Sequence, residues 1–411
     1  MSAARCRFCA ASLSRMFCDL GLSPLSNAYI DPARQPEKEA VYPLRAWLCE
    51  QCMLVQLEAF ETPENIFGDY AYFSSFSDSW LAHSRAYAGA MRSRLALGTQ
   101  SLIVEVASND GYLLQYFAVE SIPVLGIAPA ANVAAEARRR GIPTLVRFFG
   151  SQLADELASQ GKRADLLIGN NVLAHVPDLN DFVQGLARLV ADDGVITMEF
   201  PHLLRLMQQN QFDTIYHEHF SYFSLFTAEK VFAAHGLAIF DVEQIPTHGG
   251  SLRVFACRGG SARNRPSSQL DALRAEERAA GLDRPEGYAQ FAGQVAATRR
   301  ALLELLRGLK DAGKRIAAYG APAKGNTLLN YCGIGPDILD YTVDRSPHKQ
   351  GKLLPGTRIP IYPPAKVAET KPDYLLILPW NIKEEIMEQM ALIRSWGGRF
   401  IVPIPKPSVM T

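Results

Sequence analysis

Short apolar segments alternate with helical segments along most of this chain, and this alternation limits the available folds more than any other feature. Residues 101–106, 122–127 and 164–169 read as buried strands. A helix is expected to begin at Tyr112, and helical patterns follow at 131–140 and 179–189. Strands separated by helices are joined by right-handed crossovers into a parallel sheet with helices on both faces. Ligands bind to such a sheet at the carboxyl ends of its strands. The sequence therefore predicts a doubly wound α/β domain.

The same alternation returns near the C-terminus, which indicates more than one domain. Strand-like segments at 315–320, 338–344 and 374–378 follow a polar, helix-rich stretch at 261–310. A chain of 411 residues is also too long for one ordinary domain. We expect three regions: a small N-terminal metal-binding module (1–65), a central Rossmann-like α/β domain (66–258), and a helical connection with a C-terminal Rossmann-like α/β domain (259–411).

Composition places the chain among globular proteins and argues against two classes of partner. Lys+Arg and Asp+Glu balance at 42 each, so no basic excess favours nucleic acid or an anionic membrane. No apolar run reaches the roughly 18 residues that span a bilayer, and the N-terminus lacks an apolar signal core. Four of the seven cysteines form Cys-x-x-Cys pairs, a pattern typical of metal binding in a reducing compartment. We therefore expect a cytoplasmic protein.

The two Cys-x-x-Cys pairs predict a structural zinc ion. Cys6 and Cys9 lie near the start of the N-terminal region, and Cys49 and Cys52 lie near its end. A two-residue gap lets one tight turn present two thiolates, and four thiolates close a tetrahedral Zn²⁺ site. A segment this small buries little core, so a bound metal would stabilise it. The pairs lie farther apart than in a usual zinc ribbon, and iron and four ordinary thiols are the alternatives.

The first strand of the central domain ends in a turn suited to a nucleoside cofactor. Small residues and a glycine in this turn let backbone amides approach a ligand, although many strand-to-helix turns look similar. In nucleoside-binding sheets the second strand ends at a carboxylate that accepts the ribose hydroxyls. This sequence places Ala128 there. The residues of the turn are Glu105, Ala107, Ser108, Asn109, Asp110 and Gly111.

The run Tyr216-His217-Glu218-His219 groups a phenol with three further titratable side chains. Such side chains seldom gather for packing alone, so the run predicts acid/base chemistry. Metal-binding helices place two histidines four residues apart, whereas His217 and His219 are two apart, which argues against a catalytic metal. Side chains of extended neighbours alternate faces. We therefore expect His217 to point away from the site as a hydrogen-bonded structural histidine.

Long motifs spread over the chain together resemble those of one known family. The chain resembles the zinc-containing sugar C-methyltransferases of deoxysugar biosynthesis in antibiotic pathways, over nearly all of its length. The resemblance implies S-adenosylmethionine (SAM) as the cofactor of the central domain, with Asn170 and Asn171 among its contacts, and a nucleotide-linked, dTDP-type 4-keto sugar as substrate. The family carries glutamate in place of Ala128, and losing that carboxylate should weaken cofactor binding by roughly 1–3 kcal/mol. The shared motifs, besides those above, are DYAYFSSFSDSW, GNNVLAHVPDLNDFV, MEFPHLL, QFDTIYHEHFSYFS, THGGSLR, YGAPAKGN, VDRSPHKQG and LPWN.

The resemblance also implies a reaction and roles for individual residues. A base removes the proton at C-3 beside the 4-keto group, and the resulting enolate attacks the sulfonium methyl. His219 is the candidate base, Tyr216 and Glu218 would hold the sugar or relay the proton, His175 would face cofactor and sugar, and Tyr70 would close the cavity. Methylation at C-5, oxygen or nitrogen is an alternative. So is a sugar-nucleotide binder without catalysis, which the missing ribose carboxylate favours.

The C-terminal domain is expected to hold the nucleotide diphosphate. The segment YGAPAKGN forms a strand-to-helix turn whose free amides and lysine suit a phosphate. An ordinary turn with a solvated lysine is the alternative reading. Trp380 and Asn381 follow a later strand at the same edge and are candidates for base or ribose contacts. The candidate substrate-binding residues are Lys324, Gly325, Asn326, Asp344 and Arg345, with His248 of THGGSLR undecided.

Overall fold

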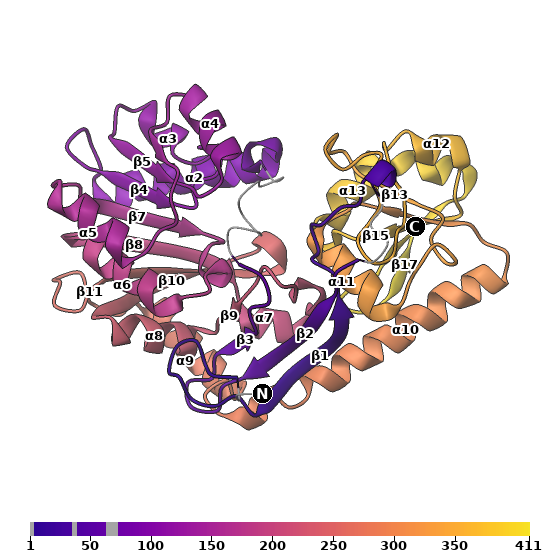
Figure 1. Cartoon of the computed structure of the whole chain (residues 1–411), viewed down its shortest axis with the longest axis horizontal. Coiled ribbons are helices and arrows are strands. Elements are labelled where there is room, and N and C mark those ends of the chain that lie inside the picture. The colour runs from indigo at the N-terminus through magenta and orange to yellow at the C-terminus, as the bar shows by residue number, and fades with distance from the viewer. Residues whose placement is uncertain (1–3, 35–38, 63–72) are drawn as a thin grey trace.

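A computed structural model of the chain describes residues 4–34, 39–62 and 73–411. Two α/β lobes diverge from a common base, which the N-terminal strands and the helix α10 (Phe291–Asp311) form together (Figure 1). Of the residues that the sequence marks as functional, Tyr70 lies outside the described ranges, and the side chain of His248 is not described either. Within those ranges, no helix is both long and apolar enough to cross a bilayer.

The N-terminal sheet takes its fourth strand from the middle of the chain. Its order is β1-β2-β3-β9, with antiparallel neighbours throughout. Val55 pairs with Tyr222 and Gln56 pairs with Ser221, so the strand that follows residues 216–219 completes the sheet. The N-terminal module therefore shares a sheet with the candidate catalytic segment. The strands are β1 (Arg15–Ser23), β2 (Tyr42–Leu48), β3 (Val55–Leu57) and β9 (Ser221–Tyr222).

The central sheet confirms the predicted doubly wound architecture. Its order is β10-β11-β8-β7-β4-β5-β6, in which β6, β5, β4, β7 and β8 are parallel and β11 is antiparallel to both of its neighbours. The strand order reverses at β4, so a ligand crevice is expected at the carboxyl ends of β4, β5 and β7. The strands are β4 (Ile103–Val106), β5 (Val124–Ile127), β6 (Thr144–Leu145), β7 (Ala164–Asn170), β8 (Val190–Pro201), β10 (Leu237–Ile245) and β11 (Ser251–Arg258).

Helices cover both faces of this sheet, because its central strands are apolar on both sides. Ile103 enters one core with α2 and α3, and its neighbour Val104 enters the opposite core with α5, α6 and α8. The expected helix at 179–189 is present as α6, whereas the helix expected from residue 112 begins only at Gln115. The helices are α2 (Asp78–Leu95), α3 (Gln115–Ala118), α4 (Ala131–Arg139), α5 (Ser151–Ser159), α6 (Leu179–Leu189), α7 (Leu203–Gln208) and α8 (Leu225–Ala234).

The C-terminal lobe holds a six-stranded sheet of order β14-β13-β12-β15-β16-β17, parallel except for β17. Helix α10 ties this lobe to the base, since Phe17 of β1 stacks on Phe291 with 4.6 Å between ring centroids. A single hydrophobic core continues from the N-terminal sheet into the lobe. Helix α9 (Ser268–Ala279) packs on α8 and β10 in the core of the central domain. The elements of the C-terminal lobe are β12 (Ile316–Tyr319), α11 (Ala323–Cys332), β13 (Thr342–Val343), β14 (Ile361–Tyr362), α12 (Lys366–Thr370), β15 (Tyr374–Ile377), α13 (Lys383–Gln389), β16 (Arg399–Val402) and β17 (Ser408–Met410).

Candidate active site

The turn after β4 has the backbone of a ligand-binding loop. Ala107 (φ 60°), Asn109 (φ 50°) and Gly111 (φ 77°) all adopt left-handed conformations. Such conformations cost a non-glycine residue roughly 1–3 kcal/mol and collect at binding sites. Within the described part of the chain, Ser108 Oγ and Asp110 Oδ1 are buried without a hydrogen-bond partner. Buried polar atoms are normally paired, so this turn fits a polar cofactor.

Polar side chains also stand at the ends of the neighbouring strands. Glu105, in β4, is fully buried, and burial raises its pKa to about 8, with the Tyr112 hydroxyl opposing part of the shift. Asn170 is the last residue of β7 and is buried, and Asn171 after it has a left-handed backbone (φ 52°). The predicted cofactor residues of β4 and β7 therefore lie along one edge of the sheet, as parallel neighbouring strands require.

The side chains of Asn109 and Asp110 also bind the backbone of residues 74 and 75, which the sequence did not indicate. Asn109 Oδ1 accepts the backbone N–H of Ser74 (3.1 Å), and Asp110 Oδ2 accepts the backbone N–H of Ser75 (3.2 Å) and its hydroxyl. These bonds fix the short helix η2 (Ser74–Phe76) over the turn. The segment that closes this side of the candidate cofactor site is therefore held by the cofactor turn itself.

The end of β5 lacks the carboxylate that a bound ribose would favour. Ala128 follows directly after the strand, is 1% exposed, and donates its backbone N–H to Leu145 O (2.9 Å). Its side chain packs with Ala130, Val133 and Ala134, against which Phe73 lies. The wall of the site is therefore apolar where the sequence pattern would place an acidic residue.

His219 has a fixed tautomer that leaves a basic nitrogen on the Tyr216 side. Its Nδ1 lies 2.8 Å from the backbone oxygen of Thr214, and its Nε2 lies 2.9 Å from the Tyr216 hydroxyl. A carbonyl oxygen only accepts, so Nδ1 carries the proton and the neutral ring keeps its lone pair on Nε2. The Tyr216 hydroxyl donates to that lone pair. The pair is therefore arranged so that a proton can pass from the phenol to the imidazole.

His175 and Glu218 complete the cluster with two groups whose protonation is controlled by burial. The His175 ring meets the His219 ring edge to face at 4.6 Å, and burial lowers the pKa of His175 to about 4. Burial also raises the pKa of Glu218 to about 7, and Asn27 Nδ2 donates to its Oε1 (2.7 Å). Asn27 is a site residue that the sequence did not single out, because an isolated asparagine between two strands carries no pattern.

Three other histidines have structural roles. His217 Nε2 donates to Pro43 O (3.2 Å) in the N-terminal module, as expected for a side chain that faces away from the site. His202 Nε2 contacts Glu277 Oε1 (2.6 Å), and this carboxylate also receives backbone N–H groups at the start of α8. His83 Nε2 lies 3.0 Å from Glu199 Oε1. Each of these contacts pairs the Nε2 atom of one of the three rings with a group of the protein.

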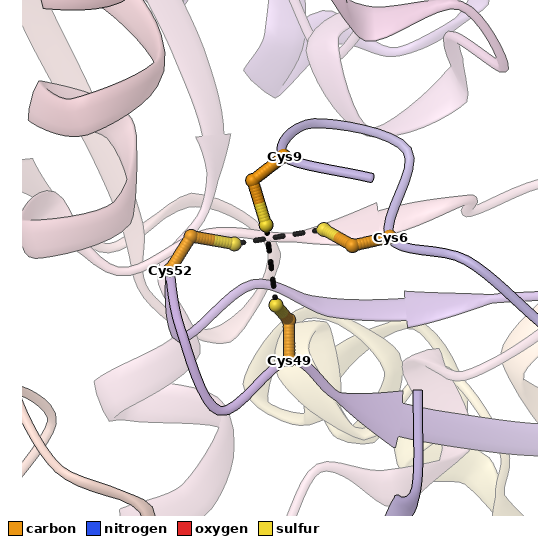
Figure 2. A group of neighbouring side chains, drawn as sticks. All are labelled: Cys6, Cys9, Cys49 and Cys52. Carbon is orange, nitrogen blue, oxygen red and sulfur yellow. Dashed lines mark hydrogen bonds between the residues drawn. The ribbon is translucent and has the colours of Figure 1, made fainter. Parts of the chain in front are cut away.

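The four cysteines of the two pairs converge on one point (Figure 2). All four sulfurs lie within 4.8 Å of one another, with Cys6 and Cys52 3.6 Å apart and Cys9 and Cys49 3.5 Å apart. Zn–S bonds of ~2.3 Å in a tetrahedron separate the sulfurs by about 3.8 Å. The thiolates therefore fit a structural Zn²⁺ ion with no position left for substrate.

Residues around the thiolates tie this module to the catalytic loops. Gln56 Nε2 donates to Cys6 Sγ (3.2 Å) while its Oε1 accepts the backbone N–H of Arg7 (2.9 Å). The Arg7 guanidinium donates to Pro177 O (2.8 Å) and to Leu57 O, and it lies 5.3 Å from the Phe220 ring centre. Pro177 follows His175, and Phe220 follows His219. The Cys6–Cys9 turn therefore contacts both histidine-bearing loops.

The candidate phosphate residues of the C-terminal lobe are mostly engaged by the protein. Lys324 Nζ donates to Asn381 Oδ1 (2.9 Å) and lies 4.8 Å from the Trp380 ring centre. Asn326 Nδ2 donates to Ser26 O, and the Asp344 carboxylate accepts backbone N–H groups of Ala321 and Ser346 (2.8 Å each). Gly325 packs against Leu378, and Arg345 is exposed. Lys324, the lysine of this turn, contacts Trp380 and Asn381, and both of these residues line the cavity described next.

A cavity of about 460 Å³ lies between the end of the central sheet and the C-terminal lobe. It borders the first residues of β11, which pair with the carboxyl end of β8, so it continues the edge that carries the cofactor turn. Its charged lining groups are Arg205, Lys383 and Glu384, and Trp380 supplies an aromatic wall. The remaining lining residues are Gln209, Gln244, Ile245, Pro246, Gly249, Gly250, Ser251, Asn381, Ile404 and Pro405.

Comparison with known proteins accounts for the whole chain. A family described as a zinc binding domain matches residues 6–67, a methyltransferase domain matches 80–242, and a C-methyltransferase C-terminal domain matches 246–405. The C-methyltransferase NovU of Streptomyces niveus is 37% identical over 406 residues, which cover 99% of this chain and 96% of that protein.

Solved structures resemble only part of the chain. Magnesium protoporphyrin IX methyltransferase from Synechocystis PCC 6803, with bound SAM, is 17% identical, covers 47% of this chain and 88% of its own, and has a TM-score of 0.33. The PH0226 protein from Pyrococcus horikoshii OT3 is 13% identical, with coverage of 49% and 100% and a TM-score of 0.38. Likenesses this weak add nothing to the sequence matches. Because NovU matches along nearly all of both chains, this chain belongs to the family of zinc-containing, SAM-dependent C-methyltransferases.

Proposed function

We propose that this enzyme methylates C-3 of a nucleotide-linked 4-keto-deoxysugar, with a dTDP-sugar as the substrate. The observation that supports this most directly is the Tyr216–His219 pair, in which a hydroxyl proton faces a neutral imidazole nitrogen. Carbon methylation needs a carbanion, and a proton beside a ketone is acidic enough for such a base. Methylation at oxygen or nitrogen requires no base of this kind at carbon.

His219 acts as the base together with Tyr216. As the C–H bond at C-3 breaks, the phenol oxygen takes the proton and its own hydroxyl proton moves to His219 Nε2, while the electron pair stays with the sugar as an enolate. Thr214 O stabilises the imidazolium through Nδ1. His175 is buried with a pKa of about 4, so it stays neutral and does not repel the charged ring 4.6 Å away.

Glu218 stabilises the enolate by donating a hydrogen bond to the C-4 oxygen. A carboxyl group can donate only when it is protonated, and the burial that raises the pKa of Glu218 to about 7 keeps much of it protonated near neutral pH. Asn27 holds one oxygen of this group at 2.7 Å and fixes its orientation. Tyr70 stays our proposal for the residue that closes the sugar site, although it lies outside the described ranges.

The cofactor site and the substrate cavity share one edge of the central sheet. SAM supplies an electrophilic methyl group to the carbanion, and we propose that it is held at the turn 105–111, at Ala128, and at Asn170 and Asn171. The nucleotide would occupy the cavity beside Trp380, with Lys324, Asn381 and the turn around His248 near the diphosphate. The four cysteines of this cluster are free and fit a metal ion, which favours a reducing compartment, so we place the reaction in the cytoplasm.

The test is loss of deuterium from a substrate labelled at C-3. Purified enzyme is incubated with SAM and a dTDP-4-keto-6-deoxysugar carrying deuterium at C-3, and label and methyl position are followed by NMR. We expect label loss and a methyl group on C-3. His219→Ala should slow both by roughly 10²- to 10⁴-fold, the usual contribution of a general base, without weakening binding of S-adenosylhomocysteine.

The control is His235→Gln, a histidine bonded to Asn180 away from the cluster, which should behave like the wild type. A methyl group on C-5, oxygen or nitrogen, with the C-3 label retained, would replace the proposal by one of the alternative methyltransferases. A folded protein that binds the sugar nucleotide but neither exchanges nor methylates it would support a binding protein instead.

A further inference from the structure

The aromatic wall of the cavity is bonded directly to the catalytic segment. Trp380, in η7 (Trp380–Ile382), lines the cavity and donates its indole N–H to Asp213 Oδ2 over 2.7 Å. Asp213 lies in η4 (Phe212–Thr214), at the start of the segment that leads to Tyr216 and His219. Both Asp213 and the indole bond are buried. This bond therefore joins the C-terminal lobe to the segment that carries the base.

A second wall of the cavity holds the same short helix. Gln211 Nε2 donates to Gly249 O (2.6 Å), and a side chain at Gly249 would collide with both Trp380 and Gln211, so only glycine allows this approach. Gln211 O in turn accepts the backbone N–H of Thr214 (3.1 Å). From α11, Thr327 Oγ1 donates to Ile215 O (3.1 Å). Groups from three elements therefore fix the position of η4.

The charge of Asp213 is matched from the C-terminal lobe. Lys324 stabilises the Asp213 carboxylate by its positive charge, whereas burial opposes ionisation and raises the pKa of Asp213 to about 6. Lys324 lies over the Trp380 ring and donates to Asn381, which also lines the cavity. A ligand that contacts Trp380 or Asn381 therefore acts on groups that surround Asp213.

The orientation of His219 depends on the residue that follows Asp213. Thr214 O accepts the Nδ1 proton of His219 at 2.8 Å, and this bond decides both the tautomer and the direction of Nε2. A displacement of about 1 Å in a catalytic group can cost 10²-fold in rate. Any shift of η4 that moves the Thr214 carbonyl would therefore be felt at the base.

We propose that Asp213 is a positioning residue that, through Trp380, couples nucleotide occupancy of the cavity to the orientation of His219. A nucleotide packed against the indole ring fixes the ring, the ring fixes Asp213, and Asp213 holds the Thr214 carbonyl in line with Nδ1. The inference rests on the proposed function, because it takes the cavity as the nucleotide site. It assigns a role to the aspartate of QFDTIYHEH and to the tryptophan of LPWN.

The first test separates proton removal from methyl transfer. Exchange of the C-3 hydrogen is followed in D₂O with the dTDP-4-keto-sugar and S-adenosylhomocysteine, for Trp380→Phe, Asp213→Ala and the double variant. Trp380→Phe keeps an aromatic wall and loses only the indole N–H. We expect it to slow exchange about tenfold while KM changes less than threefold. The double variant should exchange no more slowly than Asp213→Ala alone, since both remove one interaction.

Trp396→Phe is the matched control, because its indole N–H is bonded to Pro372 O (3.0 Å) within the same lobe and away from the cavity. It should exchange at the wild-type rate. Exchange at the wild-type rate in Trp380→Phe would overturn the inference. So would a double variant whose loss of exchange rate is the product of the two single losses. Either result would leave the proposed function standing. Absence of C-3 exchange in the wild type would remove both.

The second test follows the imidazole ring of His219 by NMR. Ring ¹⁵N signals of histidine are recorded with and without thymidine diphosphate as the probe. In the wild type, the signals assigned to His219 by loss in His219→Gln should shift on addition of the nucleotide, and in Trp380→Phe they should not. A shift of equal size in both proteins, with thymidine diphosphate bound in both, would show that occupancy reaches His219 without Trp380 and would contradict the proposal.

Discussion

Single atoms decide the chemistry of the catalytic cluster. The sequence places two histidines two residues apart, and only the structure shows that Nδ1 of His219 faces a carbonyl while His217 faces the N-terminal module. The bonding partner fixes the tautomer, and the tautomer leaves Nε2 as the basic atom. In the same tautomer with the opposite ring orientation, the basic nitrogen would face Thr214 O instead of the Tyr216 hydroxyl.

Glu218 makes the reaction sensitive to pH on the alkaline side. Because burial raises its pKa to about 7, the donating carboxyl form is present below that pH and is lost above it. We expect kcat to fall as pH rises through 7, and Glu218→Gln, whose amide donates at every pH, to flatten this limb. The pH dependence of kcat in the two proteins is the measurement. An alkaline limb that is unchanged in the variant would assign it to another group.

The raised pKa of Glu218 should also make the free energy of unfolding depend on pH. The folded pKa of Glu218 lies above the value of about 4.3 in an unfolded chain, so the folded protein is favoured while the group is protonated. The free energy of unfolding should therefore fall as pH rises from about 4.3 through 7, and this component should be missing in Glu218→Gln. Urea denaturation at several pH values would show it. Parallel curves for both proteins would contradict burial of an ionisable Glu218.

Ala128 stands just after the end of β5, where the sequence pattern predicts an acidic residue. Ala128→Glu should restore a ribose acceptor and tighten binding of S-adenosylhomocysteine by roughly 5- to 150-fold, which corresponds to about 1–3 kcal/mol. Isothermal titration calorimetry measures this. Ala128→Gln has almost the same size and no charge, so it separates the carboxylate from crowding against Phe73. Equal affinity in all three proteins would mean that other groups already bind the ribose.

At the scale of elements, the turn Cys6–Cys9 (the zinc knuckle) should hold neighbouring loops in place as well as stabilise the fold. Arg7, between the ligands Cys6 and Cys9, contacts the loop after His175 at Pro177 and the residue after His219, Phe220. The backbone carbonyls of Pro177 and of Leu57 in β3 accept its protons, and the Phe220 ring lies 5.3 Å from the guanidinium, so the relative position of these segments depends on Arg7. The positions of the loops that carry the candidate residues His175 and His219 therefore depend partly on a residue of the N-terminal module.

Arg7→Ala should lower kcat about tenfold without loss of zinc. The substitution removes the bonds to Pro177 O and Leu57 O but none of the four thiolates. Zinc content by elemental mass spectrometry and kcat are measured together. Arg5→Ala is the matched control, since Arg5 is exposed and bonds only within the same turn, to Ala10 O. If both variants retain full activity, the contacts of Arg7 have no catalytic role.

At the scale of the molecule, the chain is joined by shared elements more than by linkers. β9 completes the N-terminal sheet, and β1 packs on α10, which leads into the C-terminal lobe (Figure 1). The catalytic segment lies where these connections meet. The three expected regions are therefore not independent domains joined only by linkers.

Removal of zinc should loosen the catalytic segment before the C-terminal lobe. Without the metal, the thiolates repel one another and the module loses its main stabilisation, and β3 then releases β9. We expect chelator treatment to increase hydrogen exchange in residues 53–57 and 217–223 while β12 and β15 stay protected. Mass spectrometry of the exchanged peptides shows this. Uniform exchange throughout the chain would mean that the module and the rest unfold as one unit.

Much of this protein was determined by sequence pattern alone. Alternating apolar segments dictate the two doubly wound sheets, because buried parallel strands must be apolar on both faces. The cysteine spacing predicts the metal site, since ligand geometry is local to each turn. The helix expected from residue 112 was wrong at its start, because the left-handed residues of the preceding turn delay the helix to Gln115.

Only the tertiary structure decided how these parts meet. The bond from Asn27 to Glu218, the reach of Arg7 to Pro177, and the Trp380–Asp213 bond all join residues that are far apart in the sequence. Each joins groups from two separate segments, and a pattern within either segment does not reveal its partner in the other. Long-range hydrogen bonds form where packed elements bring their partners together, and they are therefore a property of the assembled fold.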